Sequence, residues 1–148
     1  MEYSQYDEDN NLSLSKFESM LKTNRVLFFD SEEFENIIHH YFEIGKMALA
    51  KKAIKLSLEQ HPTSISLKLF QVEVYVFENK LNMADQLLNR LYDIEPTNEE
   101  IYIQKANIFS KKDKHEKAIN ILQQALEFSE DNADIFSLIG MEYLFLDK

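Results

Sequence analysis

The sequence contains no cysteine and no tryptophan, and it has only two glycines and two prolines among 148 residues. Without cysteine, the chain has no disulfide, no thiolate nucleophile and no cysteine-based zinc site. The scarcity of glycine and proline disfavours a sheet sandwich, whose turns need these residues, and favours long helices joined by short turns. Because the only glycines are Gly45 and Gly140, a glycine-rich phosphate loop is excluded. We therefore expect an all-α protein.

Positive charge is also scarce. Sixteen Lys and Arg face 26 Asp and Glu, which gives a formal net charge of −10 at pH 7. Phosphate affinity comes largely from clustered basic residues, so this composition argues against a nucleic-acid or anionic-membrane binder. Residues 1–11 lack the basic and apolar segments of a secretory signal, and no apolar run reaches membrane-spanning length. These features predict a cytoplasmic protein.

What the sequence does contain is a 34-residue period, the spacing of its two prolines, Pro62 and Pro96. Helix-capping residues, turn-forming residues, aromatic residues and alanines each recur in one column of this register. The four columns are Asp30, Ser64, Asn98 and Asn132; Gly45, Asn79, Asp113 and Asp147; Tyr41, Tyr75, Phe109 and Tyr143; and Ala50, Ala84 and Ala118. Such self-similarity predicts stacked helix pairs, because each repeat can bury its apolar faces only against its neighbours.

The register divides the chain into segments. These are a flexible acidic N-terminus at 1–11, a capping helix and apolar strap at 12–30, repeats at 31–64, 65–98 and 99–132, and the first helix of a truncated fourth repeat at 133–148. Ser15 and Glu18 offer a capping box for the capping helix. The incomplete fourth repeat predicts that the chain is an N-terminal fragment of a longer array.

The columns resemble the tetratricopeptide repeat, in a bacterial-type member of that family. The residues of the third repeat that match its pattern are Tyr102, Ala106, Phe109, Ala118, Leu122 and Ala125. Lys68 replaces the first aromatic residue of the second repeat, and Glu130 replaces the closing proline of the third, without shifting the register. The resemblance implies a right-handed α-solenoid of antiparallel helix pairs. Pentatricopeptide repeats have a similar period but tend to be basic, so this acidic chain fits them poorly.

The resemblance also implies a concave groove, lined by the first helix of each repeat, that binds a protein or peptide. The groove residues are Glu35, His39, Phe42, Glu43, Leu69, Glu73, Phe77, Ile103, Asn107 and Lys111. The family's best-known groove holds a terminal carboxylate with basic side chains, but Glu100 and Gln104 stand at two of those positions in this chain. We therefore expect a ligand with apolar anchors and some positive charge. In an alternative interpretation, the acids complement helix dipoles and the aromatic residues pack against neighbouring helices.

Catalytic chemistry has little support in the sequence. Glu35, His39 and Glu43 are spaced four apart, so they share a helix face that can present metal ligands or an acid and base pair. A histidine between two glutamates on an acidic helix is more often part of a solvated ion-pair stripe. We predict no catalytic residue, no cofactor and no metal, so the chain is expected to be a non-catalytic scaffold or adaptor.

A second hypothesis concerns the uncovered end of the fourth repeat. Ile139, Tyr143 and Leu146 lie at helical spacing there and lack a following helix to cover them. In this interpretation the chain is a structural segment of a longer scaffold, whose main contacts are repeat stacking and self-association into a homodimer through that end. Groove composition constrains the charge of a partner but not its identity.

Overall fold

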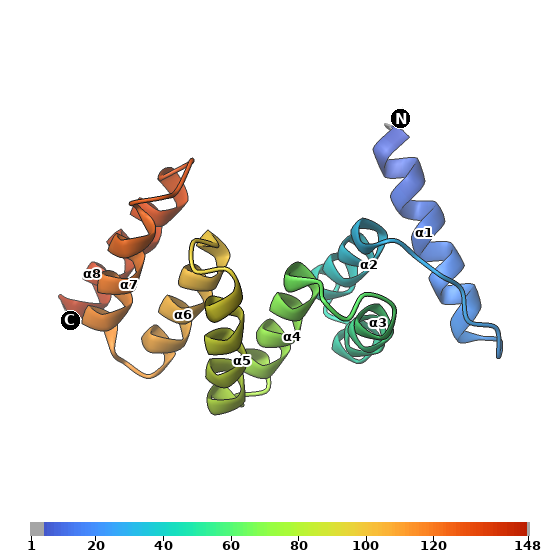
Figure 1. The fold of residues 1–148 in the computed structure, drawn as a ribbon, viewed down its shortest axis with the longest axis horizontal. Helices are drawn as coiled ribbons and strands as arrows, with labels where there is room; N and C mark the ends of the chain where they lie inside the picture. Colours follow the sequence, from blue (N-terminus) through green and yellow to red (C-terminus); the bar gives the residue numbers. More distant parts are fainter. Residues whose placement is uncertain (1–4, 148) are drawn as a thin grey trace. The chain divides into compact units, whose positions relative to one another are not determined.

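A computed structural model describes residues 5–147, with the backbone alone for residues 5–7. The described residues form eight helices and no strand (Figure 1). The helices are α1 (Gln5–Leu21), α2 (Ser31–Glu43), α3 (Met47–Gln60), α4 (Ile65–Phe77), α5 (Leu81–Ile94), α6 (Glu99–Lys111), α7 (His115–Ala125) and α8 (Ala133–Leu146). The prediction of an all-α fold is confirmed for these residues. The chain divides after Gln71 into an N-terminal and a C-terminal compact unit.

The first helix is longer than the sequence indicates. It begins at Gln5 rather than at residue 12 and so takes in most of the expected flexible N-terminus. The part of that expectation that falls on residues 1–4 lies outside the described residues. A hydrogen bond to α2 supports the added turns, since Asn36 Nδ2 donates to Asn10 Oδ1 over 2.8 Å. Just after them, Ser13 Oγ donates to Glu33 Oε2 over 2.7 Å.

The capping box expected at Ser15 and Glu18 is wrong, because both residues lie inside α1. The capping box of this region belongs to α2. There the Asp30 side chain accepts a hydrogen bond from the Glu33 backbone, and the Glu33 side chain accepts one from the Asp30 backbone. Glu18 has a different role, since its carboxylate accepts a 3.1 Å hydrogen bond from the Tyr41 hydroxyl.

An aromatic core holds α1 on the N-terminal unit. The Phe17 ring lies 6.1 Å from the Phe29 ring and 6.0 Å from the Tyr41 ring, measured between centroids. All three side chains are almost fully buried. Burial, the Glu18 charge and the hydrogen bond to Glu18 raise the pKa of Tyr41 to about 12. A hydrogen bond holds the strap before α2 in place: the Phe29 backbone N–H donates to Gln60 Oε1 over 3.0 Å.

Three tight turns confirm the column of turn-forming residues. Gly45, Asn79 and Asp113 have φ of 72°, 59° and 59°, the left-handed region that glycine, asparagine and aspartate tolerate best. In each turn the next backbone N–H bonds to the carbonyl five residues earlier. These bonds are Lys46 to Tyr41 at 2.9 Å, Lys80 to Tyr75 at 2.7 Å, and Lys114 to Phe109 at 2.8 Å. Asp147 differs, because its φ of −75° is right-handed.

The column of capping residues holds for three of its four members. Asp30 caps α2, the Asn98 side chain accepts from Glu100 N over 3.0 Å, and Ser64 Oγ accepts from Leu67 N over 3.3 Å. The prediction for Asn132 is wrong.

Asn132 does not cap α8, because its backbone is already helical, with φ of −82° and ψ of −10°. Asp131 takes its place, accepting from Ala133 N over 3.0 Å. The Asn132 side-chain oxygen is buried and has no hydrogen-bond partner among the described residues.

The alanine column lies in the buried contacts between helices. Ala50 in α3, Ala84 in α5 and Ala118 in α7 each have 0% of their surface exposed. In the C-terminal unit, Ala118 belongs to a core shared by α6, α7 and α8. That core also contains Tyr102, Ala106, Ile119, Leu122, Ala125, Ile135 and Ile139. Because small residues let helix backbones come close, Ala118 allows α7 to pack closely in the core that it shares with α6 and α8.

Candidate functional site

A cavity of about 440 Å³ lies on the C-terminal unit. Its walls come from the second half of α4, the exposed face of α6, and single turns of α7 and α8. Five of the predicted groove residues line it, and they are Glu73, Phe77, Ile103, Asn107 and Lys111. The structure therefore brings half of the predicted set together at one hollow.

The other five predicted groove residues belong to the N-terminal unit. His39 Nε2 and Glu43 Oε1 lie 3.0 Å apart, with 65% of each side chain exposed. Glu35 is half-buried, and the Phe42 ring packs 5.8 Å from the Phe70 ring. Leu69 is buried, with 7% exposed, so it contributes packing rather than open surface.

Metal-binding side chains do not cluster in the part of the chain that the structure describes. No group of three or more His, Asp or Glu residues there could hold a metal ion. On α2 only His39 and Glu43 of the spaced trio form an ion pair. Within residues 5–147, no helix is both long enough and apolar enough to cross a membrane.

Exposed apolar area and negative charge mark the cavity. Phe77 is 70% exposed, and Ile103 beside it is half-buried. Glu73, Glu100 and Glu142 line the cavity, against one basic residue, Lys111. This composition favours a ligand that combines apolar and basic groups.

Glu100 is a cavity acid whose carboxyl pKa is shifted. Although part of its surface meets solvent, desolvation raises the pKa of its carboxyl. The neighbouring Glu99 carboxylate raises this pKa further, and a hydrogen bond from Gln104 opposes the change. A carboxylate that has lost part of its hydration gains more than a fully solvated one from a cation placed against it.

Gln104 is a cavity residue outside the predicted groove set, although the sequence places it at a position of the family's best-known groove. It is only 8% exposed, and its Nε2 donates to Glu100 Oε1 over 3.3 Å. Its Oε1 is buried and has no hydrogen-bond partner among the described residues. The sequence carried a signal: Gln104 is a polar residue at helical spacing between Ile101 and Ile108, both buried.

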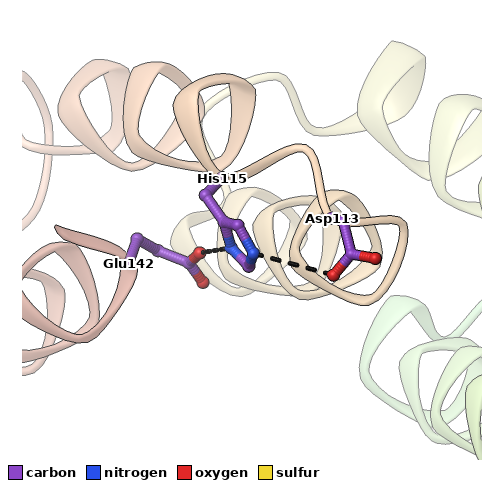
Figure 2. A network of polar contacts seen from close by, with 3 residues as sticks. All are labelled: Asp113, His115 and Glu142. Atoms are coloured by element: carbon purple, nitrogen blue, oxygen red, sulfur yellow. Dashed lines mark hydrogen bonds and ion pairs between the residues drawn. The ribbon is translucent and has the colours of Figure 1, made fainter. Parts of the chain in front are cut away.

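Glu142 is a second cavity residue that the prediction missed, and Figure 2 shows how it is held. His115 Nδ1 lies 2.7 Å from Glu142 Oε2, while His115 Nε2 lies 3.8 Å from Asp113 Oδ1. The Phe145 ring stacks on the imidazole at 5.0 Å with an interplanar angle of 18°. The network ties the first residue of α7 to α8 and fixes one wall of the cavity. An isolated acid within the apolar stretch of α8 was the available signal.

The predicted self-association residues of α8 divide between core and surface. Ile139 is 8% exposed and packs in the C-terminal core. Tyr143 and Leu146 are 49% and 41% exposed. Of the three predicted residues, these two are therefore available to a partner. Other apolar side chains of the same helix are exposed as well. Those side chains are Phe136, Met141, Leu144 and Phe145.

Comparisons with known proteins place the repeat and the fold. The tetratricopeptide repeat family model matches residues 99–132, the span of the third repeat in the 34-residue register. Two solved structures, MamA of AMB-1 and MamA of MSR-1, are each 16% identical to the chain over 93% of its length. They are covered over 87% and 84% of their own length, with TM-scores of 0.61 and 0.59. No curated protein matches the sequence.

At 16% identity, the likeness to the MamA structures shows the fold, which is an all-α helical-repeat fold of the α-solenoid class. The matched repeat lies within that fold and includes α6, the helix that contributes most to the cavity. Such repeats serve in general as scaffolds for protein–protein interaction. The chain therefore contains one segment, residues 99–132, that matches the tetratricopeptide repeat model, within an all-α fold similar to that of the MamA structures.

Proposed function

We propose that this chain is a non-catalytic interaction scaffold or adaptor that binds a peptide or helix segment of another protein at the cavity on its C-terminal unit. One observation carries the proposal. Residues expected to face a ligand, on α4 and α6, converge on a single hollow where a large aromatic side chain remains open to solvent. Exposed apolar surface beside a concave site is typical of a protein-interaction surface.

Apolar contacts supply the binding area in this proposal. Phe77 and Ile103 present an aromatic and a branched aliphatic side chain from two helices, and Val76 extends the patch. A partner side chain that enters between them removes this surface from water. Aromatic anchors at the centre of an interface commonly dominate its binding energy.

Acidic residues supply selectivity for charge. Glu73 and Glu100 favour a partner segment with basic residues and oppose an acidic one. Because Lys111 also lines the cavity, the field there is mixed, and the partner's basic group should be placed close to the acids.

A selection from a random peptide library on the purified chain tests the proposal. We expect the recovered peptides to combine apolar residues with Arg or Lys. The substitution Phe77→Ser should weaken their binding by about tenfold or more, as for a central interface residue. Phe136→Ser is the matched control, because Phe136 is 57% exposed but lies outside the cavity lining. Failure to recover any peptide, or equal losses in the two variants, would contradict the proposal.

A charge variant tests separately whether the negative charge of the cavity contributes to binding. Glu73→Lys should weaken binding of a selected basic peptide, and the difference from wild type should shrink as salt is raised. Glu127→Lys makes the same change at a position outside the cavity lining and should leave binding unchanged. An equal effect of both variants would indicate only the overall charge.

Self-association through α8 is a second candidate function, and the exposed apolar side chains of that helix favour it. In this case the partner is another copy of the chain, which would cover Tyr143 and Leu146. Light scattering during size-exclusion chromatography should then show a concentration-dependent dimer that Tyr143→Asp abolishes. A monomer at every concentration would rule this candidate out.

A further inference from the structure

We infer that Gln104 and Glu100 form a subsite for an arginine side chain of the bound segment. The inference rests on the proposed function and narrows it, because it names the basic residue that the cavity selects and the two side chains that select it. It starts from the hydrogen-bonding state of Gln104.

The amide of Gln104 is only half satisfied. Its Nε2 donates to Glu100 Oε1 over 3.3 Å, whereas its Oε1 is buried and has no hydrogen-bond partner among the described residues. A buried acceptor without a donor is costly, because it has lost its water and gained nothing in return. Since Gln104 lines the cavity, a donor brought there by a ligand can reach it. The terminal torsion of glutamine is broad, so the oxygen can turn toward that donor. The turn gives up the 3.3 Å bond from Nε2 to Glu100, and a ligand donor to Glu100 replaces that bond.

Two acceptors therefore lie side by side. Glu100 and Gln104 are one turn apart on α6, and their polar ends already touch. The Glu100 carboxylate is partly desolvated and would gain from a positive charge. Glu142 is already paired with His115, and Lys111 is basic. Of the other two cavity acids, Glu73 and Glu100, Glu100 is the one whose carboxylate contacts the Gln104 amide, so we place the cation there.

Arginine fits this pair of acceptors better than lysine does. A guanidinium is planar and carries several N–H donors, so it can bond the Glu100 carboxylate and the Gln104 oxygen at the same time. It is also less strongly hydrated than an ammonium group, which lowers the cost of entering a partly apolar cavity. Its aliphatic stem can pack along Phe77 and Ile103, the apolar part of the lining.

The test uses a peptide recovered from the random library that carries one Arg, together with two synthetic versions in which Lys or citrulline replaces it. Citrulline keeps the shape and loses the charge. We expect binding to the wild-type chain, measured by calorimetry, to fall by about tenfold with citrulline and by about threefold to tenfold with Lys, as expected for a charged bidentate contact. In Gln104→Leu, the Arg and Lys peptides should bind within about twofold of each other.

A matched control and a folding check accompany this variant. Gln124→Leu replaces an exposed glutamine of α7 and should keep the full preference for Arg. Gln104→Leu removes an acceptor that has no partner among the described residues, and it also removes the 3.3 Å hydrogen bond to Glu100. Because these two changes oppose each other, its melting temperature should stay close to that of wild type. If Gln104→Leu fails to fold, Glu100→Gln replaces it, and in that variant the difference between Arg and citrulline should fall at least about threefold.

The outcomes separate the two proposals. If peptides bind but citrulline replaces arginine without loss, or if the arginine preference persists in both Gln104→Leu and Glu100→Gln, the subsite is wrong and the general function stands. If no peptide binds the wild-type chain, the proposed function is overturned and the subsite with it. Loss of the preference in the variants, with Gln124→Leu unchanged, supports the subsite.

Discussion

The faces of α2 and α6 occupy the same positions of the 34-residue register and yet differ in chemistry. On α2 the positions hold Glu35, His39 and Glu43, and the last two form a solvent-exposed ion pair. The equivalent positions of α6 are Ile103, Asn107 and Lys111, and all three line the cavity of the C-terminal unit. The register therefore sets the direction of each side chain, whereas the binding character of a position depends on its residue and on what neighbouring helices add.

Substitutions in the alanine column should have the largest effect, and they test whether equivalent positions of different repeats are packed alike. Ala50→Leu and Ala118→Leu each force extra carbons into a fully buried site and should lower the free energy of unfolding by about 1 to 3 kcal/mol. Urea denaturation measures the effect, with Ala48→Leu, outside the buried positions of α3, as control. A loss confined to one of the two buried sites would show that the repeats are not equivalent in packing.

Helix capping differs between two equivalent positions, Asp30 and Asn132. Asp30→Ala removes a capping box and should cost about 0.5 to 2 kcal/mol of unfolding free energy. Asn132→Ala, in the same column, should cost nothing, because Asn132 does not cap α8 and its side-chain oxygen has no partner among the described residues. Equal losses in chemical denaturation would mean that Asn132 does cap its helix.

In the aromatic column, the residues of α2 and α6 differ by one hydroxyl group. Tyr41 donates to Glu18, while its equivalent in α6 is Phe109. Tyr41→Phe should cost about 1 kcal/mol at neutral pH through the lost hydrogen bond.

The same substitution also has a signature at alkaline pH. The folded pKa of Tyr41 is raised from 10.0 to about 12, so its stabilising contribution is complete below pH 10 and disappears as pH rises through 12. Melting temperatures of Tyr41→Phe should therefore fall less steeply than those of wild type across that range. Tyr143→Phe, at an exposed tyrosine, should follow the wild-type curve.

The smallest effect concerns Glu100. Its pKa is raised above 4.5 in the folded chain, so its favourable contribution is present at pH below 4.5 and is lost as pH rises through the folded pKa. Glu100→Gln should therefore raise the melting temperature slightly at pH 7, with the gain shrinking as pH falls through the folded pKa toward 4.5. Glu32→Gln, at the equivalent position of α2, measures the loss of a first-turn acid alone. A lower melting temperature for Glu100→Gln at pH 7 would contradict a raised pKa for the Glu100 carboxyl.

Local chemistry explains which parts of the fold the sequence could predict. The turns at Gly45, Asn79 and Asp113 were predictable because few residue types tolerate a positive φ. The start of α1 was not, because it depends on a hydrogen bond that Asn10 makes with a helix that follows later in the chain. Such contacts leave no local pattern in the sequence.

The candidate site was predictable to a similar extent. The repeat register placed Phe77 and Ile103 on the ligand-facing side of their helices, and both line the cavity. The same register could not show that Leu69 is buried, since that depends on which helices pack beside it. Glu142 was missed because a single polar residue in an apolar stretch does not by itself distinguish a cavity wall from open surface. Gln104 stood at a known groove position but was not in the predicted set.

The three left-handed turns also bear on how a chain of this kind can change its length. Each turn is closed by the same backbone hydrogen bond, whether the residue is glycine, asparagine or aspartate. Because the joint does not depend on a particular side chain, a whole 34-residue segment can be duplicated or deleted between two such turns without creating a new kind of junction. The turns themselves would therefore not limit growth of the array by whole repeats.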